Sequence, residues 1–163
     1  MYKRQVIPEG GLTLGSTAIS STAAEINYND ISTLGTSAAS KTLTADANGL
    51  TKITGAVLNV EDTLTDQATI AWNVLTSPVA KVTLGANRTL GAATGSQAGQ
   101  FVSLLIIQDG TGSRTVTFNA AYEFKDDTAP TLTTTANKGD LFVFRYNGSK
   151  FLEVGRNQNL TLS

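Results

Sequence analysis

Hydrophobic and polar residues alternate along the C-terminal part of the chain with the two-residue period of a β-strand. In residues 101–108 the apolar side chains fall on both alternating sides, which predicts a central strand that is covered on both faces. Residues 141–146 and 149–154 alternate in the same way on either side of Asn147 and Gly148, a dipeptide typical of a two-residue hairpin turn. The pattern therefore predicts strands joined by short turns.

The predicted hairpin is apolar on both of its faces. A two-residue turn would place Phe144 opposite Phe151 and Val143 opposite Leu152. One face would carry Phe142, Phe144, Tyr146 and Phe151, and the other Leu141, Val143, Leu152 and Val154. A two-sheet sandwich normally leaves one face of each sheet in water, so we expect a second covering surface, from another subunit or from the N-terminal part of the chain. The candidates for packing in the core or between subunits are Phe142, Phe144, Phe151 and Leu152.

The first 66 residues differ in composition from the rest of the chain. Serine, threonine, alanine and glycine predominate there, and all but two of the aromatic residues follow residue 70. Such a segment cannot bury much surface by itself. Thr22 and Glu25 have the spacing of a capping box, which predicts one short helix. We therefore divide the chain into an extended N-terminal arm, residues 1–66, and a β-sandwich domain, residues 67–163.

The number and spacing of the strand-like segments define the fold class. About seven or eight of them follow one another closely, which predicts an all-β fold with an antiparallel β-sandwich or jelly-roll-like domain. No strict long-period repeat is present, which argues against a solenoid. The scarcity of Glu and Lys, which usually fill exposed helix positions, excludes a helical bundle.

Composition excludes most enzyme chemistry. The 163 residues contain no cysteine and no histidine, so thiol nucleophiles, disulfides, Cys/His zinc sites and imidazole acid–base catalysis are excluded. Lys and Arg together number 12, and Asp and Glu together number 13. The chain therefore lacks the excess of positive charge that is typical of nucleic-acid-binding proteins. No apolar run is long enough to span a membrane. We expect a non-enzymatic protein with no cofactor, no metal, no nucleic-acid partner and no membrane contact.

Carboxylates are the remaining candidates for chemistry. Four of them could supply the acid pair of a polysaccharide-cleaving enzyme: Glu123, Asp126, Asp127 and Glu153. Neighbouring aspartates on a strand would point to opposite sides, so a strand that runs into a solvated turn explains this segment better. A second acidic group, Glu61, Asp62 and Asp66, does not have the spacing of an EF-hand calcium loop.

Charged residues at two places are candidates for contacts with partners. Arg145 and Lys150 are expected to face each other beside the hairpin turn, either to meet an acidic partner or to form a charged tip that protects a sheet edge. Near the N-terminus, positive and apolar side chains together could anchor the arm or contact a capsid: Lys3, Arg4, Val6 and Ile7. Trp72 and the phenylalanines after it could stack on sugars, although their spacing favours packing in a core or an interface.

Three segments of the chain resemble proteins of tailed-bacteriophage virions. Residues 20–28 and 34–49 resemble a recurrent stretch of such proteins, with Asn29-Asp30-Ile31 where that stretch usually continues into an Asp-Gly turn. Residues 108–116, Gln-Asp-Gly-Thr-Gly-Ser-Arg-Thr-Val, resemble a stretch of phage fibre and head-decoration β domains. The resemblance implies a non-enzymatic virion building block, commonly a homotrimer, that cements the capsid exterior or forms part of a fibre.

Of these two roles, the size of the chain favours decoration of the capsid. A fibre is expected to show a long shaft of heptads or repeats, and neither fits into the arm. We expect a trimeric decoration (cement) protein on the capsid exterior of the virion, whose partners are its own copies and the major capsid protein. The alternative is a tail fibre or tail-tip component that binds a host receptor or glycan. A polysaccharide depolymerase is the third hypothesis.

Overall fold

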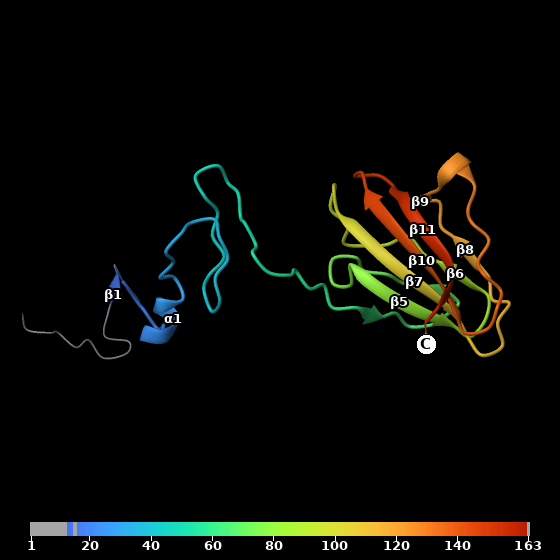
Figure 1. Cartoon of the computed structure of the whole chain (residues 1–163), viewed down its shortest axis with the longest axis horizontal. Helices are drawn as coiled ribbons and strands as arrows, with labels where there is room; N and C mark the ends of the chain where they lie inside the picture. The colour runs from blue at the N-terminus through green and yellow to red at the C-terminus, as the bar shows by residue number, and fades with distance from the viewer. Residues whose placement is uncertain (1–12, 15, 163) are drawn as a thin grey trace, which may run out of the picture. The chain divides into compact units, whose positions relative to one another are not determined.

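The structure is a computed structural model that describes residues 13–14 and 16–162. Contacts within the chain divide it into two units, Met1–Leu58 and Asn59–Ser163, which we call the arm unit and the β unit. Figure 1 labels the elements of both. Among the described residues, no helix has the length and apolar character needed to cross a membrane.

The arm unit has little regular structure. The strands β1 (Thr13–Leu14) and β2 (Thr17–Ala18) pair antiparallel, and α1 is a helix of five residues, Ala23–Asn27. Thr22 caps this helix: its Oγ1 accepts a hydrogen bond from the Glu25 backbone N–H at 3.2 Å, and Glu25 Oε2 accepts one from the Thr22 backbone N–H at 2.8 Å. The short helix that the capping box predicts is confirmed.

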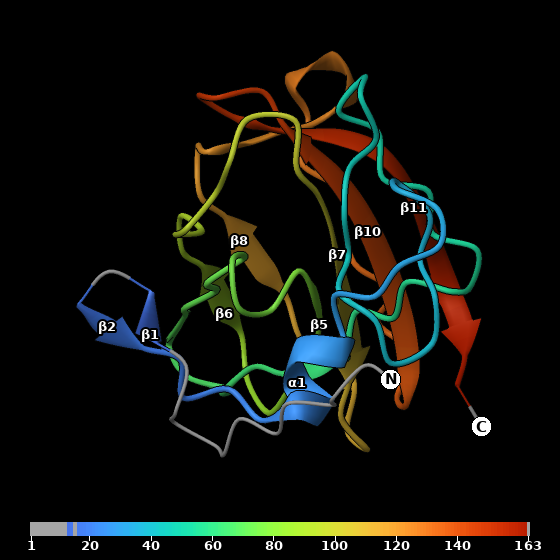
Figure 2. The same cartoon turned by 90° about the vertical axis from the view of Figure 1, so that its left-hand side faces the viewer.

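The β unit contains two sheets. Its strands are β3 (Asp62–Thr63), β4 (Thr69–Ile70), β5 (Val79–Leu84), β6 (Arg88–Leu90), β7 (Phe101–Gln108), β8 (Val116–Phe118), β9 (Tyr122–Glu123), β10 (Lys138–Tyr146) and β11 (Phe151–Thr161), with a 3₁₀ turn, η1 (Lys125–Asp127), after β9. A six-stranded sheet has the order β3-β5-β7-β10-β11-β9, and a three-stranded sheet has the order β4-β6-β8. Figure 2 shows β6 and β8 as a layer separate from β7, β10 and β11.

From β3 to β8 the chain alternates between the two sheets. Neighbours in the series β3, β5, β7 and in the series β4, β6, β8 are parallel, because each corner carries the chain across to the other sheet. Antiparallel pairing joins β7 to β10 and β10 to β11. The all-β fold with an N-terminal arm is thus confirmed, whereas its strand pairing is mixed rather than antiparallel throughout. The number of residues from one strand to its parallel neighbour, for example from β3 to β5 and from β5 to β7, is not constant. This explains why the sequence shows no fixed period.

The core lies between the two sheets and is rich in aromatic side chains. Phe142, Phe144 and Phe151 of the six-stranded sheet are buried there. The ring of Phe118, from the three-stranded sheet, meets that of Phe142 edge to face, with centroids 5.5 Å apart. Trp72 is also buried, and its Nε1 donates a hydrogen bond to the Ser77 carbonyl at 2.7 Å. These side chains therefore stabilise the fold, each by about 1.5–3 kcal/mol, and they form no exposed sugar platform.

The hairpin between β10 and β11 has a longer loop than the sequence predicts. Tyr146 pairs with Phe151, so Phe144 faces Glu153, and the predicted pairing of Phe144 with Phe151 is wrong. The reason is Asn147, whose Oδ1 accepts hydrogen bonds from the backbone N–H groups of residues 149 and 150 at 2.9 and 2.8 Å and so stabilises a four-residue loop. Because the register moves by two residues, the aromatic side chains still share the core-facing side.

Candidate functional site

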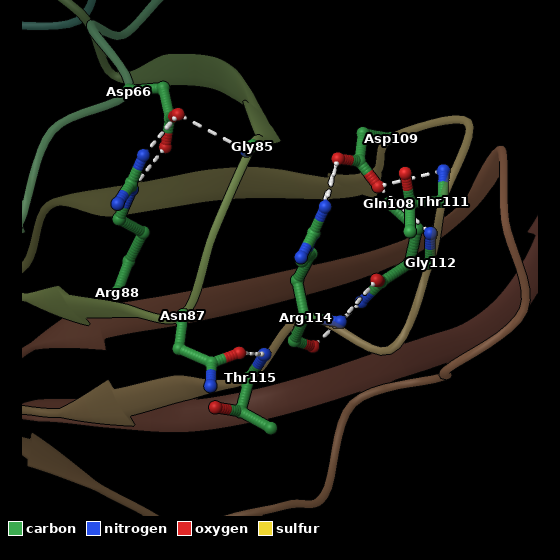
Figure 3. Close-up of polar contacts among 10 residues, drawn as sticks. All are labelled: Asp66, Gly85, Asn87, Arg88, Gln108, Asp109, Thr111, Gly112, Arg114 and Thr115. Atoms are coloured by element: carbon green, nitrogen blue, oxygen red, sulfur yellow. Dashed lines mark hydrogen bonds and ion pairs between the residues drawn. The ribbon is translucent and has the colours of Figure 1, made fainter.

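A cluster of polar side chains lies at the corners where the chain passes between the sheets (Figure 3). Asp66, which precedes β4, accepts hydrogen bonds from Arg88 Nε at 2.6 Å, from Arg88 Nη2 at 2.7 Å and from the Gly85 backbone N–H at 3.1 Å. These contacts, that with the Arg88 guanidinium above all, hold the pKa of the Asp66 carboxyl below its usual value. The pair ties the start of β6 to the segment before β4.

The corner after β7 is built on a second carboxylate–arginine pair. Asp109 accepts from Arg114 Nη2 at 2.8 Å and from the backbone N–H groups of Thr111 and Gly112 at 3.0 and 2.8 Å. The Arg114 hydrogen bond, followed by that from Gly112, lowers the pKa of Asp109. Gln108 Oε1 accepts from the Arg114 backbone N–H at 2.8 Å, and Gln108 Nε2 donates to the Arg114 carbonyl at 2.9 Å.

The corner cluster therefore has a structural explanation. Its carboxylates and arginines bind one another and the backbone, as Figure 3 shows, and Thr115 N–H donates to Asn87 Oδ1 at 3.0 Å. Gly112 has φ +75°, and a Cβ there would lie 2.5 Å from the Thr134 carbonyl oxygen, so this position requires glycine. The stretch 108–116, which carries the resemblance to phage β domains, is thus one of the corners that join the two sheets.

Two of the four candidate carboxylates lie together at an exposed edge. Glu123 at the end of β9 accepts a hydrogen bond from Lys150 Nζ, and this contact lowers the pKa of Glu123. A hydrogen bond with Glu123 raises the pKa of Asp127. Asp126 and Asp127 both have left-handed backbone conformations, φ 58° and 53°, which places them in a tight turn. Glu153 lies on β11.

Arg145 and Lys150 do not face each other. Arg145 pairs with Leu152, and Lys150 forms its ion pair with Glu123, so the predicted like-charge pair is wrong. The four-residue hairpin loop is the cause, because it moves Lys150 off the strand. Arg145 is exposed and has no ion-pair partner among the described residues. The candidate anchor residues Lys3, Arg4, Val6 and Ile7 lie outside the described residues.

The side of the six-stranded sheet that faces away from the three-stranded sheet is largely apolar. We call this surface the outer face, and it comprises Val79, Phe101, Leu105, Ile107, Leu141, Val143 and Leu152. Burial alternates along β7, where Val102 and Leu104 are buried, whereas on the other side Phe101 is exposed and Leu105 is half-buried. Phe101 is 58% exposed. A cavity of ≈ 230 Å³ opens beside it, against Val79 and Val143.

Sequence reasoning predicts β7 as a strand that is covered on both faces, and within the described β unit only the inner face is covered by a sheet. Phe101 is therefore the residue whose role the sequence alone did not reveal. The signal in the sequence is its position at the start of a strand that is apolar on both alternating sides. Among the described residues, no group of three or more carboxylates could hold a metal ion.

Comparison with known proteins gives one match. Nothing among curated proteins or solved structures matches the chain. Residues 65–150, slightly more than half of the chain, match the family described as "Putative phage tail fibre C-terminal domain". The match begins just before β4 and ends in the hairpin loop before β11, so it includes the whole three-stranded sheet, the corner cluster and all strands of the six-stranded sheet except β3 and β11. The chain belongs to this family of phage tail fibre domains and is a phage virion structural protein.

Proposed function

We propose that this protein is a component of a phage tail fibre, and that its β unit assembles with two further copies of the chain through the outer face. The observation that carries the proposal is the open apolar surface around Phe101, in a domain that matches a tail fibre family. Large apolar patches on a soluble protein mark contact surfaces, because exposing them to water is unfavourable. The protein acts in this proposal by binding and not by catalysis.

The charge distribution supports an apolar assembly surface. The outer face has two charged neighbours, Lys81 and Arg145, and Lys81 already pairs with Glu61 at 2.6 Å. Association through such a surface depends on buried aliphatic and aromatic side chains rather than on ion pairs. The trimer should therefore persist when salt screens exposed charges. Dissociation at moderate salt would contradict this mode of assembly.

Capsid decoration is the second candidate function. The observation in its favour is that the family match begins at residue 65 and leaves the whole arm unit unmatched. An arm with many exposed apolar side chains suits a protein that lies across neighbouring capsid subunits, with the major capsid protein as its partner. In this alternative the β unit would keep the same trimeric assembly, but the arm would supply the attachment.

Labelling of intact virions tests the position. An antibody raised against residues 67–163 is bound to particles and viewed by electron microscopy, and the copy number per particle is measured in the same preparation. The tail fibre proposal predicts label at the tail and a small number of copies. Label over the head at hundreds of copies would establish decoration instead.

A further inference from the structure

A run of exposed apolar side chains lies just before the first strand of the β unit. Val57, Leu58 and Val60 are 68%, 82% and 75% exposed, and no other four consecutive residues of the described chain carry three exposed large apolar side chains. We call residues 57–60 the linker segment. Residues 53–60 contain no charged side chain. Contact of so many apolar groups with water is unfavourable, so this segment is a candidate for contact with another surface.

The backbone of the linker segment makes no hydrogen bond within the described chain. Before it, the Thr54 N–H donates to Ser37 Oγ at 3.0 Å, and after it regular pairing begins where Asp62 of β3 lies opposite Ala80 of β5. Valine and leucine in close succession are typical of a strand that packs on an apolar surface. The linker segment therefore offers both its side chains and its backbone groups to a partner.

The linker segment enters the β unit at the end of the sheet where Phe101 lies. β3 runs parallel to β5, with Asp62 opposite Ala80, so Val60 passes beyond the first residue of β5. Phe101 also lies beyond that end of β5, because β7 begins two residues before its pairing with β5. Asn59 lines the cavity of ≈ 230 Å³ beside Phe101. The linker segment and the outer face are therefore continuous surfaces of one copy.

A threefold assembly needs two different surfaces that fit each other. Around a threefold axis each copy presents one surface to the next copy and another to the previous copy. The outer face is one such surface, and its partner has to be apolar and uncharged to avoid burying an unpaired charge. The linker segment has both properties, and no other run of the described chain concentrates exposed large apolar side chains to the same extent.

We propose that the linker segment of each copy packs against the outer face of a neighbouring copy in the trimer, with Leu58 in the cavity beside Phe101. This inference rests on the proposed function and names the partner of the outer face. Leu58 is the most exposed large apolar side chain of the described chain, and Val79 and Val143 of the neighbour would cover it together with Phe101. Each copy gives one linker segment and receives one, which closes the ring after three copies.

Disulfide cross-linking between variants of the full chain tests the proposal, because the sequence contains no cysteine. A Leu58→Cys chain with an affinity tag and an untagged Val143→Cys chain are co-expressed, purified together and mildly oxidised. Two cysteines link when their Cα atoms lie within about 7 Å of each other. Since each chain carries one cysteine, every disulfide joins two copies. We expect a covalent pair that contains one copy of each variant, identified by its mass.

Leu34→Cys in place of Leu58→Cys is the matched control, because Leu34 is a 62% exposed leucine outside the linker segment. We expect the mixed pair to form roughly tenfold less with this control, since disulfide formation requires a short Cα separation. An equal yield, absence of the mixed pair, or self-linkage of Leu58→Cys in its place overturns the proposal.

Light scattering of the same sample before oxidation separates failure of the proposal from failure of the proposed function. A trimer without the mixed pair contradicts the linker contact and leaves trimer assembly intact, whereas a monomer contradicts both. Should Val143→Cys fail to fold, Val79→Cys replaces it, because Val79 lines the same cavity.

Discussion

The arm unit and the β unit are stabilised by different kinds of contact. The β unit buries large side chains such as Trp72 and Phe142 between two sheets. The arm unit instead relies on local polar contacts, for example Asp46 Oδ1, which accepts from two backbone N–H groups at 2.8 and 2.9 Å. Many of its described larger apolar side chains, among them Leu34 and Leu43, are exposed. From this comparison we expect the β unit to fold on its burial alone and the arm unit to need a partner.

Separation of the two units should give the largest effect. We expect residues 59–163 to unfold cooperatively on heating and residues 1–58 to show no cooperative transition, because among the described residues the buried hydrophobic core lies entirely in the β unit. Differential scanning calorimetry of the two fragments measures this. In the intact chain, removal of residues 1–19 should leave the β unit folded and weaken assembly of the protein. A truncated chain that unfolds would contradict the division into two parts.

A pair of alanine substitutions compares a buried with an exposed apolar side chain. Phe142→Ala should lower the free energy of unfolding by about 3–5 kcal/mol, because it leaves a cavity in the core. Leu34→Ala, at a side chain that is 62% exposed, should change it by less than about 0.5 kcal/mol. Urea titrations give both values. Similar losses in the two variants would mean that the arm unit has a core of its own.

The corner cluster should make stability depend on pH. Arg88 lowers the pKa of Asp66 in the folded state, so this contribution is fully present above the unfolded-state pKa of about 3.9 and is lost as the pH falls through the lower folded-state pKa. Asp66→Asn should therefore lower the free energy of unfolding by about 1–3 kcal/mol at pH 7 and by progressively less below pH ~4. Urea titrations across this range measure the loss.

Glu61→Gln is the control for the corner cluster. The exposed ion pair of Glu61 with Lys81, in which each side chain is 40% exposed, should contribute less than about 1 kcal/mol. If Asp66→Asn lowers the free energy of unfolding by the same amount at every pH, the pKa of Asp66 is not linked to folding.

Removal of the helix cap should have the smallest effect on the whole chain. Thr22→Ala removes both contacts of the Thr22 hydroxyl with Glu25, keeps the one from the Thr22 backbone N–H, and should destabilise α1 by about 1 kcal/mol. Because α1 contributes no buried side chain, the thermal transition of the β unit should not move. NMR chemical shifts of residues 23–27 report the loss of helix. A lowered transition temperature would show that α1 supports the β unit.

Strand positions could be predicted from the sequence because they depend on local alternation and turn residues. The pairing of strands could not, since the corner at residues 109–113 carries the chain into another sheet and looks like an ordinary hairpin turn in the sequence. The hairpin register depends on one side chain, Asn147, that bonds to two backbone groups. Asp140 is similar: it is buried and accepts hydrogen bonds from the Thr133 and Asn159 N–H groups, which only the fold brings together.

As with the strands, the residues of the candidate sites could be predicted from the sequence, but their contacts could not. The carboxylates are visible in the sequence, but the contact of Glu123 with Lys150 and the burial of Glu153 depend on the hairpin loop and the bulge in β11. The sequence does indicate that one face of the sheet needs a further covering surface. It does not indicate that Phe101 lies on that face, because the apolar residues of β7 alternate without a polar partner.

The oligomeric state of an outer-face variant tests the central claim most directly. Phe101→Asp places a charge on the exposed apolar surface, and Thr117→Asp places the same charge at an exposed position of the three-stranded sheet. Light scattering during size exclusion should give a trimer for the unchanged chain and for Thr117→Asp, and a folded monomer for Phe101→Asp. A monomeric unchanged chain, or a trimer that survives Phe101→Asp, would contradict assembly through the outer face.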